Sequence, residues 1–220
     1  MTQPADKPAQ KSAASEWWDT LVVIVEALLI AIVLRFFLYQ PFSIPTASMQ
    51  QTLMIGDYFV ANKFVWGYGK HSFSLGRYGD FALLDFELPI SNRIFGRDPN
   101  RGDIAVFRPV PQNIEYIKRI VGLPGDRIQV KEGRLFINGT MVERELVGTA
   151  EDTDSNGDTR QVQVYRETFP EGTTHIIQEI GDNLPLDNTP EYVVPAGHYF
   201  MMGDNRDRSA DSRVLSQVGY

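Results

Sequence analysis

One continuous apolar run dominates the N-terminal part of the chain. Residues 21–38 read LVVIVEALLIAIVLRFFL, and 16 of these 18 residues are apolar. At about 1.5 Å per residue a helix of this length spans roughly 27 Å, close to the hydrocarbon thickness of a bilayer. Trp17 and Trp18 precede the run and Tyr39 follows it, as is typical of the two membrane interfaces. The pattern predicts a transmembrane helix over 21–39.

Two other structures have the same apolar pattern. The first alternative is a helix buried in a protein core. Glu26 and Arg35 are the two charged residues inside the run, and their placement has to be explained in either case. They lie nine residues apart, roughly 900° around a helix, so they do not pair with each other. Arg35 is close enough to the end to reach the interface, whereas Glu26 has to be neutral or face a partner. A signal peptide is the other alternative, and the long lead with two tryptophans disfavours it.

The charges beside the apolar run predict its orientation. Lys7, Lys11 and the terminal amine precede it, whereas residues 39–62 contain no Lys or Arg. The positive-inside rule then places the N-terminus in the cytoplasm and the rest of the chain outside it. We therefore expect a disordered cytoplasmic tail over 1–20, the membrane helix over 21–39 and an exported domain over 40–220.

Downstream of the membrane segment, short apolar runs alternate with turn residues. Tight turns are predicted at Lys131-Glu132-Gly133 and at Asn138-Gly139. This spacing predicts a mainly β domain, a sandwich or barrel. Residues 67–100 suggest an inserted loop region, and the acidic residues 149–160 a solvated loop rather than a calcium site. The strands are expected at 58–64, 103–108, 115–121, 126–130, 134–138, 161–167, 174–179 and 198–202.

Composition removes several classes of function. The net charge of −7 disfavours a nucleic-acid binder, which normally carries a basic face. Without cysteine the chain has no thiolate zinc site, no iron–sulfur cluster and no cysteine nucleophile. The histidines, at 71, 175 and 198, are too scattered for a HExxH metal site. We expect no metal and no cofactor.

Three segments carry side chains that could do chemistry. Residues 41–49, PFSIPTASM, place hydroxyls on an extended loop, although such hydroxyls are common in linkers. Lys118 lies in an apolar strand beside Tyr116 and Ile120. It is either an edge-strand lysine that reaches solvent or a base whose pKa burial lowers from about 10.4. Residues 203–213, GDNRDRSADSR, are either a polar turn or a network of ion pairs.

Taken in order, these segments closely resemble bacterial signal peptidase I, a membrane-anchored Ser–Lys endopeptidase. PFSIPTASM is similar to its nucleophile box, RGDIAVF (101–107) to a structural strand, YIKRIVGLPGD (116–126) to its lysine box and GDNRDRSADSR to its most specific signature. RLFING (134–139) fits the hairpin after the lysine box, and the resemblance covers roughly residues 40–215.

The resemblance implies a role for each matched residue. Ser48 would be the nucleophile and Lys118 the general base. Thr46 and the Ser48 amide would form the oxyanion hole, Ser209 would orient the lysine amine, and Asp211 and Arg213 would form a supporting ion pair. The pockets for small substrate residues one and three positions before the cut would be lined by Phe42, Ile44, Pro45, Met49, Leu53, Tyr116 and Ile117.

The resemblance also implies partners and a location. The substrates would be preproteins that carry signal peptides, and the only other partner would be the lipid bilayer, with no nucleic acid and no metal. The enzyme would cross the bacterial inner membrane once, with its catalytic domain on the outer, periplasmic face.

The sequence departs from the family pattern at two places. Gln51 stands where the nucleophile box usually has a proline, and the chain stops at Tyr220, before the strand and tail that normally follow. We therefore expect an incomplete or shortened C-terminus. Two other functions stay open, a non-catalytic membrane-tethered β domain that serves in binding or assembly, and a self-cleaving Ser–Lys regulator. The membrane segment and the lack of a DNA-binding helix pair or basic patch disfavour the regulator.

Overall fold

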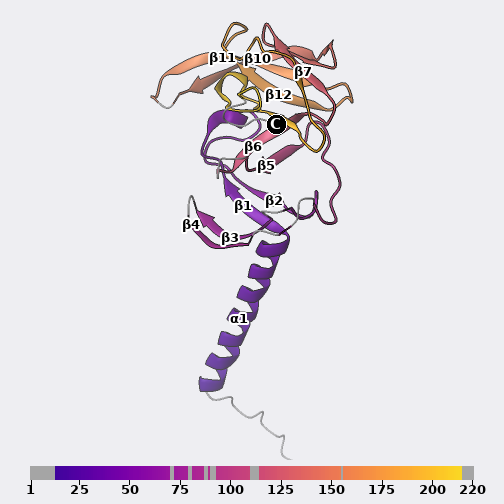
Figure 1. Ribbon diagram of the computed structural model, residues 1–220. Coiled ribbons are helices and arrows are strands. Elements are labelled where there is room, and N and C mark those ends of the chain that lie inside the picture. The colour runs from indigo at the N-terminus through magenta and orange to yellow at the C-terminus, as the bar shows by residue number, and fades with distance from the viewer. Residues whose placement is uncertain are drawn as a thin grey trace, which may run out of the picture. The chain divides into compact units, whose positions relative to one another are not determined.

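A computed structural model describes residues 13–69, 72–78, 81–86, 89, 93–109, 114–154 and 156–214 (Figure 1). The chain divides into two compact units. Unit 1 comprises residues 1–40 and 62–96, and unit 2 comprises residues 41–61 and 97–220. The apolar run 21–38 belongs to unit 1, whereas all the residues expected to carry chemistry belong to unit 2.

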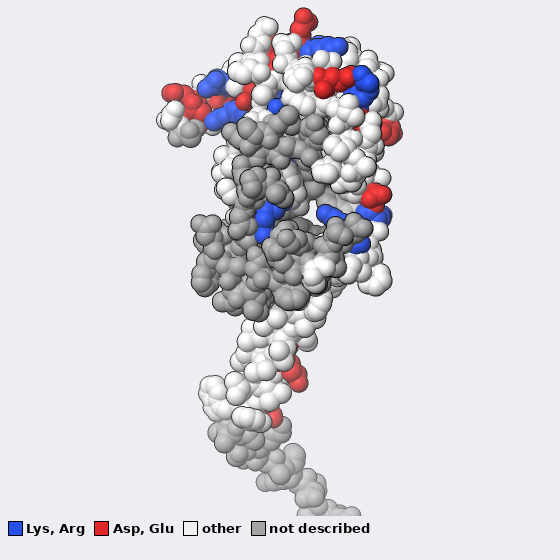
Figure 2. Space-filling model, in the orientation of Figure 1, with Lys and Arg blue, Asp and Glu red and all other residues white. Residues whose placement is uncertain are grey.

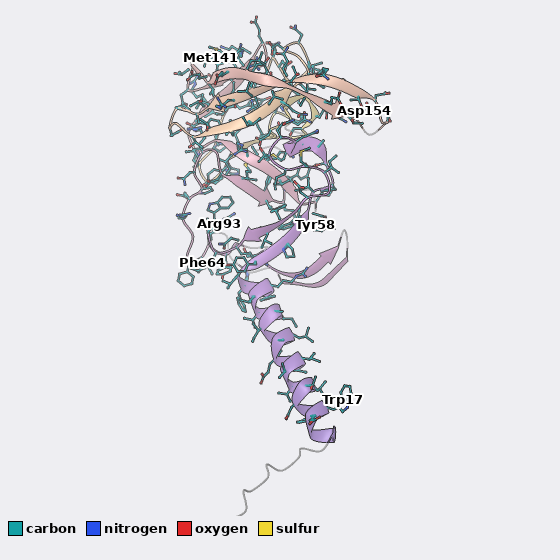
Figure 3. The ribbon with its side chains drawn as sticks, turned by 180° about the vertical axis from the view of Figure 1, so that it is seen from behind. Trp17, Tyr58, Phe64, Arg93, Met141 and Asp154 are labelled. Carbon is teal, nitrogen blue, oxygen red and sulfur yellow. The ribbon has the colours of Figure 1, made fainter. Side chains whose placement is uncertain are left out.

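Unit 1 is built on one long helix, α1 (Ala13–Phe37). Its stretch from Glu16 to Phe37 is long and apolar enough to cross a membrane, and none of it is buried in the protein. Figure 2 shows a helix surface that is almost uncharged apart from a few acidic side chains. Trp17, which is 76% exposed, projects near the N-terminal end of α1 (Figure 3). Because the helix begins at Ala13, residues 13–20, expected in the tail, are helical.

The segment expected as an inserted loop contains a β-hairpin. Strands β3 (Phe73–Tyr78) and β4 (Phe81–Phe86) are antiparallel, with Phe73 opposite Phe86 and Tyr78 opposite Phe81. The prediction of a loop throughout 67–100 is therefore wrong for these residues. Aromatic residues favour strands, but Gly76 and the flanking glycines hid that preference in the sequence.

Unit 2 is mainly β, as the sequence predicted. β1 (Tyr39–Ser43), whose first two residues lie in unit 1, pairs with β2 (Tyr58–Asn62). The other described strands of this unit form three antiparallel sheets. Their orders are β14-β6-β5, β13-β7-β8-β9 and β10-β11-β12. The strands are β5 (Ile104–Phe107), β6 (Tyr116–Gly122), β7 (Arg127–Lys131), β8 (Arg134–Ile137), β9 (Thr140–Met141), β10 (Glu143–Thr153), β11 (Thr159–Thr168), β12 (Thr174–Glu179), β13 (Tyr192–Val193) and β14 (Phe200–Met202).

Both predicted tight turns are confirmed. Glu132 and Gly133 join β7 to β8 with φ of 49° and 71°. Asn138 and Gly139 join β8 to β9 with φ of 53° and 80°. Two consecutive residues with positive φ match the right-handed twist of a hairpin, which explains why Gly and Asn occupy these turns.

The acidic segment 149–160 is mostly strand, and its prediction as a solvated loop is wrong for residues 149–153 and 159–160. β10 continues to Thr153 and β11 begins at Thr159, with Asp152 opposite Arg160. The turn is closed by Asp154, whose carboxylate accepts hydrogen bonds from the amides of Asn156 (2.8 Å) and Asp158 (3.0 Å). Figure 2 shows acidic and basic side chains intermixed where Figure 1 labels β10 and β11. Arg166 of β11 lies opposite Glu145 of β10 and donates to its carboxylate at 2.8 Å. Such pairs of opposite charge stabilise a polar hairpin whose composition alone resembles that of a loop.

One apolar core fixes the strands that lead to the site. It joins β6, β7, β8 and β14, so the strand that carries Lys118 and the strand that precedes residues 203–213 are anchored in the same packing. Its members are Val121, Ile128, Val130, Leu135, Ile137, Val142, Phe169, Tyr192, Val194, Phe200 and Met202.

Candidate active site

Ser48 lies on a single turn of 3₁₀ helix, η1 (Ala47–Met49). Thr46 precedes it in extended conformation, with φ of −131° and ψ of 153°. Ser48 is only 6% exposed, and its carbonyl oxygen accepts a hydrogen bond from the Asn205 amide at 3.1 Å. The hydroxyl therefore sits on a loop whose backbone is tied to the segment that follows β14.

Lys118 lies in the middle of β6, opposite Ala105 of β5, and is 3% exposed. Its Nζ donates a hydrogen bond to Ser48 Oγ at 2.7 Å and another to the Ile117 carbonyl at 3.0 Å. The ammonium nitrogen lies 5.4 Å from the centre of the Tyr116 ring, which confirms the predicted same-face neighbour. The structure thus brings the two residues expected to form a dyad into direct contact.

Burial changes the acidity of this lysine. Removal from water disfavours the charged amine and lowers the pKa of Lys118 from 10.5 to about 8, although the carboxylates of Asp211 and Asp204 partly oppose the shift. A substantial fraction of the amine is then neutral near physiological pH, and only a neutral amine accepts a proton.

Thr46 Oγ1 lies 3.4 Å from Ser48 Oγ on the exposed side of the loop. A hydroxyl so close to the nucleophile can donate a hydrogen bond to a negatively charged oxygen that develops beside it. Its position is compatible with the oxyanion-hole role that the resemblance implies.

The predicted ion pair between Asp211 and Arg213 is confirmed as a contact. Arg213 Nε and Nη2 donate to the two carboxylate oxygens, each at 2.9 Å, and Gly203 N donates to Asp211 Oδ2 at 3.0 Å. Burial would raise the pKa of Asp211, but Arg213 outweighs it and holds the pKa below its usual range. Arg213 also donates to the Arg206 carbonyl at 2.5 Å, so the pair fixes the backbone of residues 203–213.

Ser209 is buried beside this network. Its hydroxyl lies near the Asp211 carboxylate and helps to lower the pKa of Asp211. The hydrogen bonds of the Lys118 amine go to Ser48 and Ile117 and not to Ser209. The structure therefore places Ser209 within the 203–213 segment without the direct contact to the lysine amine that the resemblance implied.

Gly203 allows the 203–213 segment to approach the nucleophile closely. A Cβ at this position would collide with Ser209 Oγ and with the carbonyl oxygen of Ser48. Because one of these atoms is backbone, the collision is relieved only by moving the loop that carries Ser48.

We expect Gly203→Ala to destabilise the fold by about 1–3 kcal/mol, as overpacking of a filled site does. Gly181→Ala is the matched control, since nothing lies within 4 Å of its added Cβ. Thermal unfolding of the two variants measures the difference. Equal melting temperatures for the two would contradict the close approach at Gly203.

Sequence reasoning missed a second ion pair next to the dyad. Arg119 donates from Nε and Nη2 to the two oxygens of Asp204, at 2.8 and 2.7 Å, and Thr52 donates to the same carboxylate at 2.5 Å. The alternation that put Lys118 on one face of β6 put Arg119 on the other, and a buried arginine needs an acidic partner. The charged 203–213 segment was the place to look for one.

A buried cluster of charged side chains attaches the 203–213 segment to β11 and β12. Arg206 donates to both oxygens of Glu167 on β11, at 2.9 and 2.5 Å, and His175 Nε2 lies 3.2 Å from that carboxylate. Burial would raise the pKa of Glu167, but Arg206 lowers it to about 2. The His175 ring stacks on Phe169, with 4.6 Å between ring centres, which gives this histidine a structural setting.

The residues expected to line the substrate pockets all belong to unit 2 and differ in exposure. Ile44 and Met49 are buried, and Pro45 is exposed. The other four expected pocket residues are partly exposed, namely Phe42, Leu53, Tyr116 and Ile117. Phe42 stacks on Phe59, with 5.3 Å between ring centres.

Within the described residues, no three His, Asp or Glu side chains gather as they do around a metal ion.

Comparison with known families decides the identity of this Ser–Lys site. A family model described as signal peptidase, peptidase S26, matches residues 17–220. The chain belongs to the signal peptidase family. It is accordingly a serine endopeptidase that cleaves signal peptides.

Individual relatives agree with the family assignment. Signal peptidase I of Rickettsia akari is 40% identical over 211 residues, covering 93% of this chain and 73% of that protein. Signal peptidase I of Rickettsia prowazekii is 40% identical over 192 residues, covering 84% and 68%. A crystal structure of an Enterococcus faecalis signal peptidase I is 26% identical and covers 56% of this chain and 90% of that one, with a TM-score of 0.30, too low to bear on the fold.

Proposed function

We propose that this chain cleaves signal peptides from preproteins with Ser48 as nucleophile and Lys118 as general base. The observation that carries the proposal is the 2.7 Å hydrogen bond between Lys118 Nζ and Ser48 Oγ, made by a lysine whose pKa burial lowers to about 8. Cleavage of a peptide with an Ala-x-Ala site by the detergent-solubilised chain tests it, with the Ser48→Ala variant as control.

The reaction follows from this arrangement in two halves. Neutral Lys118 accepts the Ser48 proton while Ser48 Oγ attacks the scissile carbonyl carbon. The tetrahedral intermediate then expels the amine of the mature protein, which takes the proton from Lys118, and an acyl-enzyme remains. Lys118 next accepts a proton from water, whose oxygen attacks the ester. Collapse releases the signal peptide carboxylic acid and returns the proton to Ser48.

We expect Thr46→Ala to lower kcat by about 10²–10³, the usual effect of losing one oxyanion-hole donor. Thr46→Ser keeps the hydroxyl and is the matched control, with kcat close to that of the wild type. Steady-state cleavage of one peptide by the three proteins provides the measurement. Full turnover by Thr46→Ala would remove Thr46 from the oxyanion hole.

Ser209, Asp211 and Arg213 take a supporting role in the proposal. The Asp211–Arg213 pair holds the 203–213 backbone, which in turn donates the Asn205 amide to the Ser48 carbonyl. Ser209 would orient the lysine amine once substrate is bound, since catalytic hydrogen bonds often tighten only in the complex.

The substrate segment would bind beside β1 and β6, with small residues at one and three positions before the cut facing the apolar side chains predicted to line the pockets.

The protein would be anchored by α1 in the bacterial inner membrane, with residues 1–20 on the cytoplasmic side and residues 40–220 on the periplasmic side. Two features support this topology, the apolar stretch Glu16–Phe37 and the absence of Lys and Arg from residues 39–62. Ser48 follows the membrane segment by only ten residues, which suits cleavage at the membrane surface.

A further inference from the structure

The backbone bends in an unusual way three residues after the nucleophile. Gln51 has φ of 77°, in the left-handed region that favours glycine. Among the described residues only three other non-glycine residues have positive φ, and two of them, Glu132 and Asn138, are in hairpin turns. Proline is confined to φ near −65°, so the proline usual at this point of the nucleophile box does not fit this backbone. A conformation of this kind persists only where its surroundings hold it.

The side chain of Gln51 supplies such a constraint. Its Nε2 donates a hydrogen bond to Oε1 of Gln178 at 2.8 Å, across 127 positions of sequence. Gln178 lies on β12 and is fully buried, and its own Nε2 has no hydrogen-bond partner among the described residues. Without Gln51 the carbonyl oxygen of this amide would also lose its partner, and an unpaired buried oxygen is costly.

Backbone hydrogen bonds connect Gln178 to the nucleophile. Gln178 N donates to the Asp204 carbonyl at 2.9 Å, and the next residue, Asn205, donates its amide to the Ser48 carbonyl at 3.1 Å. Gln178 and Asn205 form a parallel β-bridge. The contacts close a ring that runs from Ser48 through Asn205 and Gln178 to Gln51 and back along the chain. Both ends of the turn 48–51 are therefore attached to the β-bridge between Gln178 and Asn205.

We propose that Gln51 is a positioning residue for Ser48, acting through the Gln51–Gln178 hydrogen bond. The bond holds the turn 48–51 so that Ser48 Oγ stays 2.7 Å from Lys118 Nζ. Gln51 itself takes no part in proton transfer. The inference rests on the proposed function, because it assumes that Ser48 and Lys118 react together. A displacement of the hydroxyl by about 1 Å is enough to slow such a reaction roughly hundredfold.

The test removes the side chain without straining the backbone. Gln51→Gly suits positive φ but cannot make the hydrogen bond, and we expect kcat to fall about tenfold to hundredfold with little change in KM. Gln50→Gly is the matched control. It makes the same change one residue earlier, where the side chain forms no hydrogen bond within the described part of the chain, and its kcat should stay within about threefold of the wild type.

A second variant tests the bond from its other side. Gln178→Met keeps the volume and removes the acceptor, and the double variant Gln51→Gly/Gln178→Met should be no slower than the slower single variant, since both remove one interaction. The acid limb of the pH–rate profile should not move in any of them, because the burial of Lys118 is unchanged. If one variant unfolds, hydrogen exchange of the backbone amides can still be measured in the remaining folded variants. The amides of Thr52 and Leu53 should exchange faster than in the wild type, whereas those of β6 should not.

The outcomes separate the inference from the proposed function. Wild-type kcat in Gln51→Gly, multiplicative losses in the double variant or a shifted acid limb would each overturn the positioning role. Cleavage by Ser48→Ala measured in the same assay would instead overturn the proposed function on which that role depends.

Discussion

Ser48→Ala and Lys118→Ala should each lower kcat/KM by about 10⁴-fold or more, and the double variant should be no worse than either single variant. The alanine at position 48 leaves no nucleophile, and the alanine at 118 leaves the Ser48 proton without an acceptor in a site where both groups are nearly fully buried. Residues that act as one unit lose their whole contribution when either is removed. Steady-state cleavage of an Ala-x-Ala peptide by the four proteins in one detergent gives the measurement.

The controls for these variants separate chemistry from folding. Lys131→Ala removes an exposed lysine from β7 and should retain wild-type turnover. Thermal unfolding should show all variants folded at the assay temperature. A folded Lys118→Ala protein with more than about a tenth of wild-type activity would mean that another group accepts the Ser48 proton.

The dependence of kcat/KM on pH should also be large. With a lysine pKa of about 8, kcat/KM should fall tenfold for each pH unit below that value, and reach about 10⁻³ of its plateau at pH 5. The sign follows from the base role, since the neutral amine is the active form and its fraction rises as pH climbs through the pKa. The profile of kcat/KM reports the free enzyme, so the peptide must be held well below KM.

Lys118→Arg sharpens the pH experiment. Its guanidinium stays charged at any usable pH, so no rise in rate should appear up to the alkaline limit of folding. A melting curve at each pH excludes unfolding as the source of the acid limb. An acid limb near 6 to 7 that persists in Lys118→Arg would point to a histidine.

Of the two members of the dyad, only Lys118 breaks a local rule in the sequence. Lys118 is a cation between bulky apolar neighbours in a strand, and burial there is what lowers its pKa. Ser48 was inconspicuous by itself and became a candidate only when the four matched segments were taken together. Strand periodicity and the Glu132-Gly133 and Asn138-Gly139 turns determined most of the β domain for equally local reasons.

The features missed depend on contacts between distant parts of the chain. β10 has a charged or hydroxyl side chain at seven of its 11 positions, and its pairing with β11 makes it a strand. Gln51 and Gln178 are 127 positions apart, and neither residue type signals the other. The lack of a hydrogen bond between Ser209 and the Lys118 amine could not be predicted either, because the resemblance implies a role but no geometry.

Direct titration of the Lys118 amine tests the central claim. With lysine labelled at its ε position, the Lys118 signal can be identified by its loss in Lys118→Ala and followed by NMR in the Ser48→Ala protein, which does not turn over substrate. A Lys118 base predicts an amine pKa near 8 that matches the acid limb of wild-type kcat/KM. A pKa close to 10.5 would contradict it, since the amine would then be charged at the pH where the enzyme works.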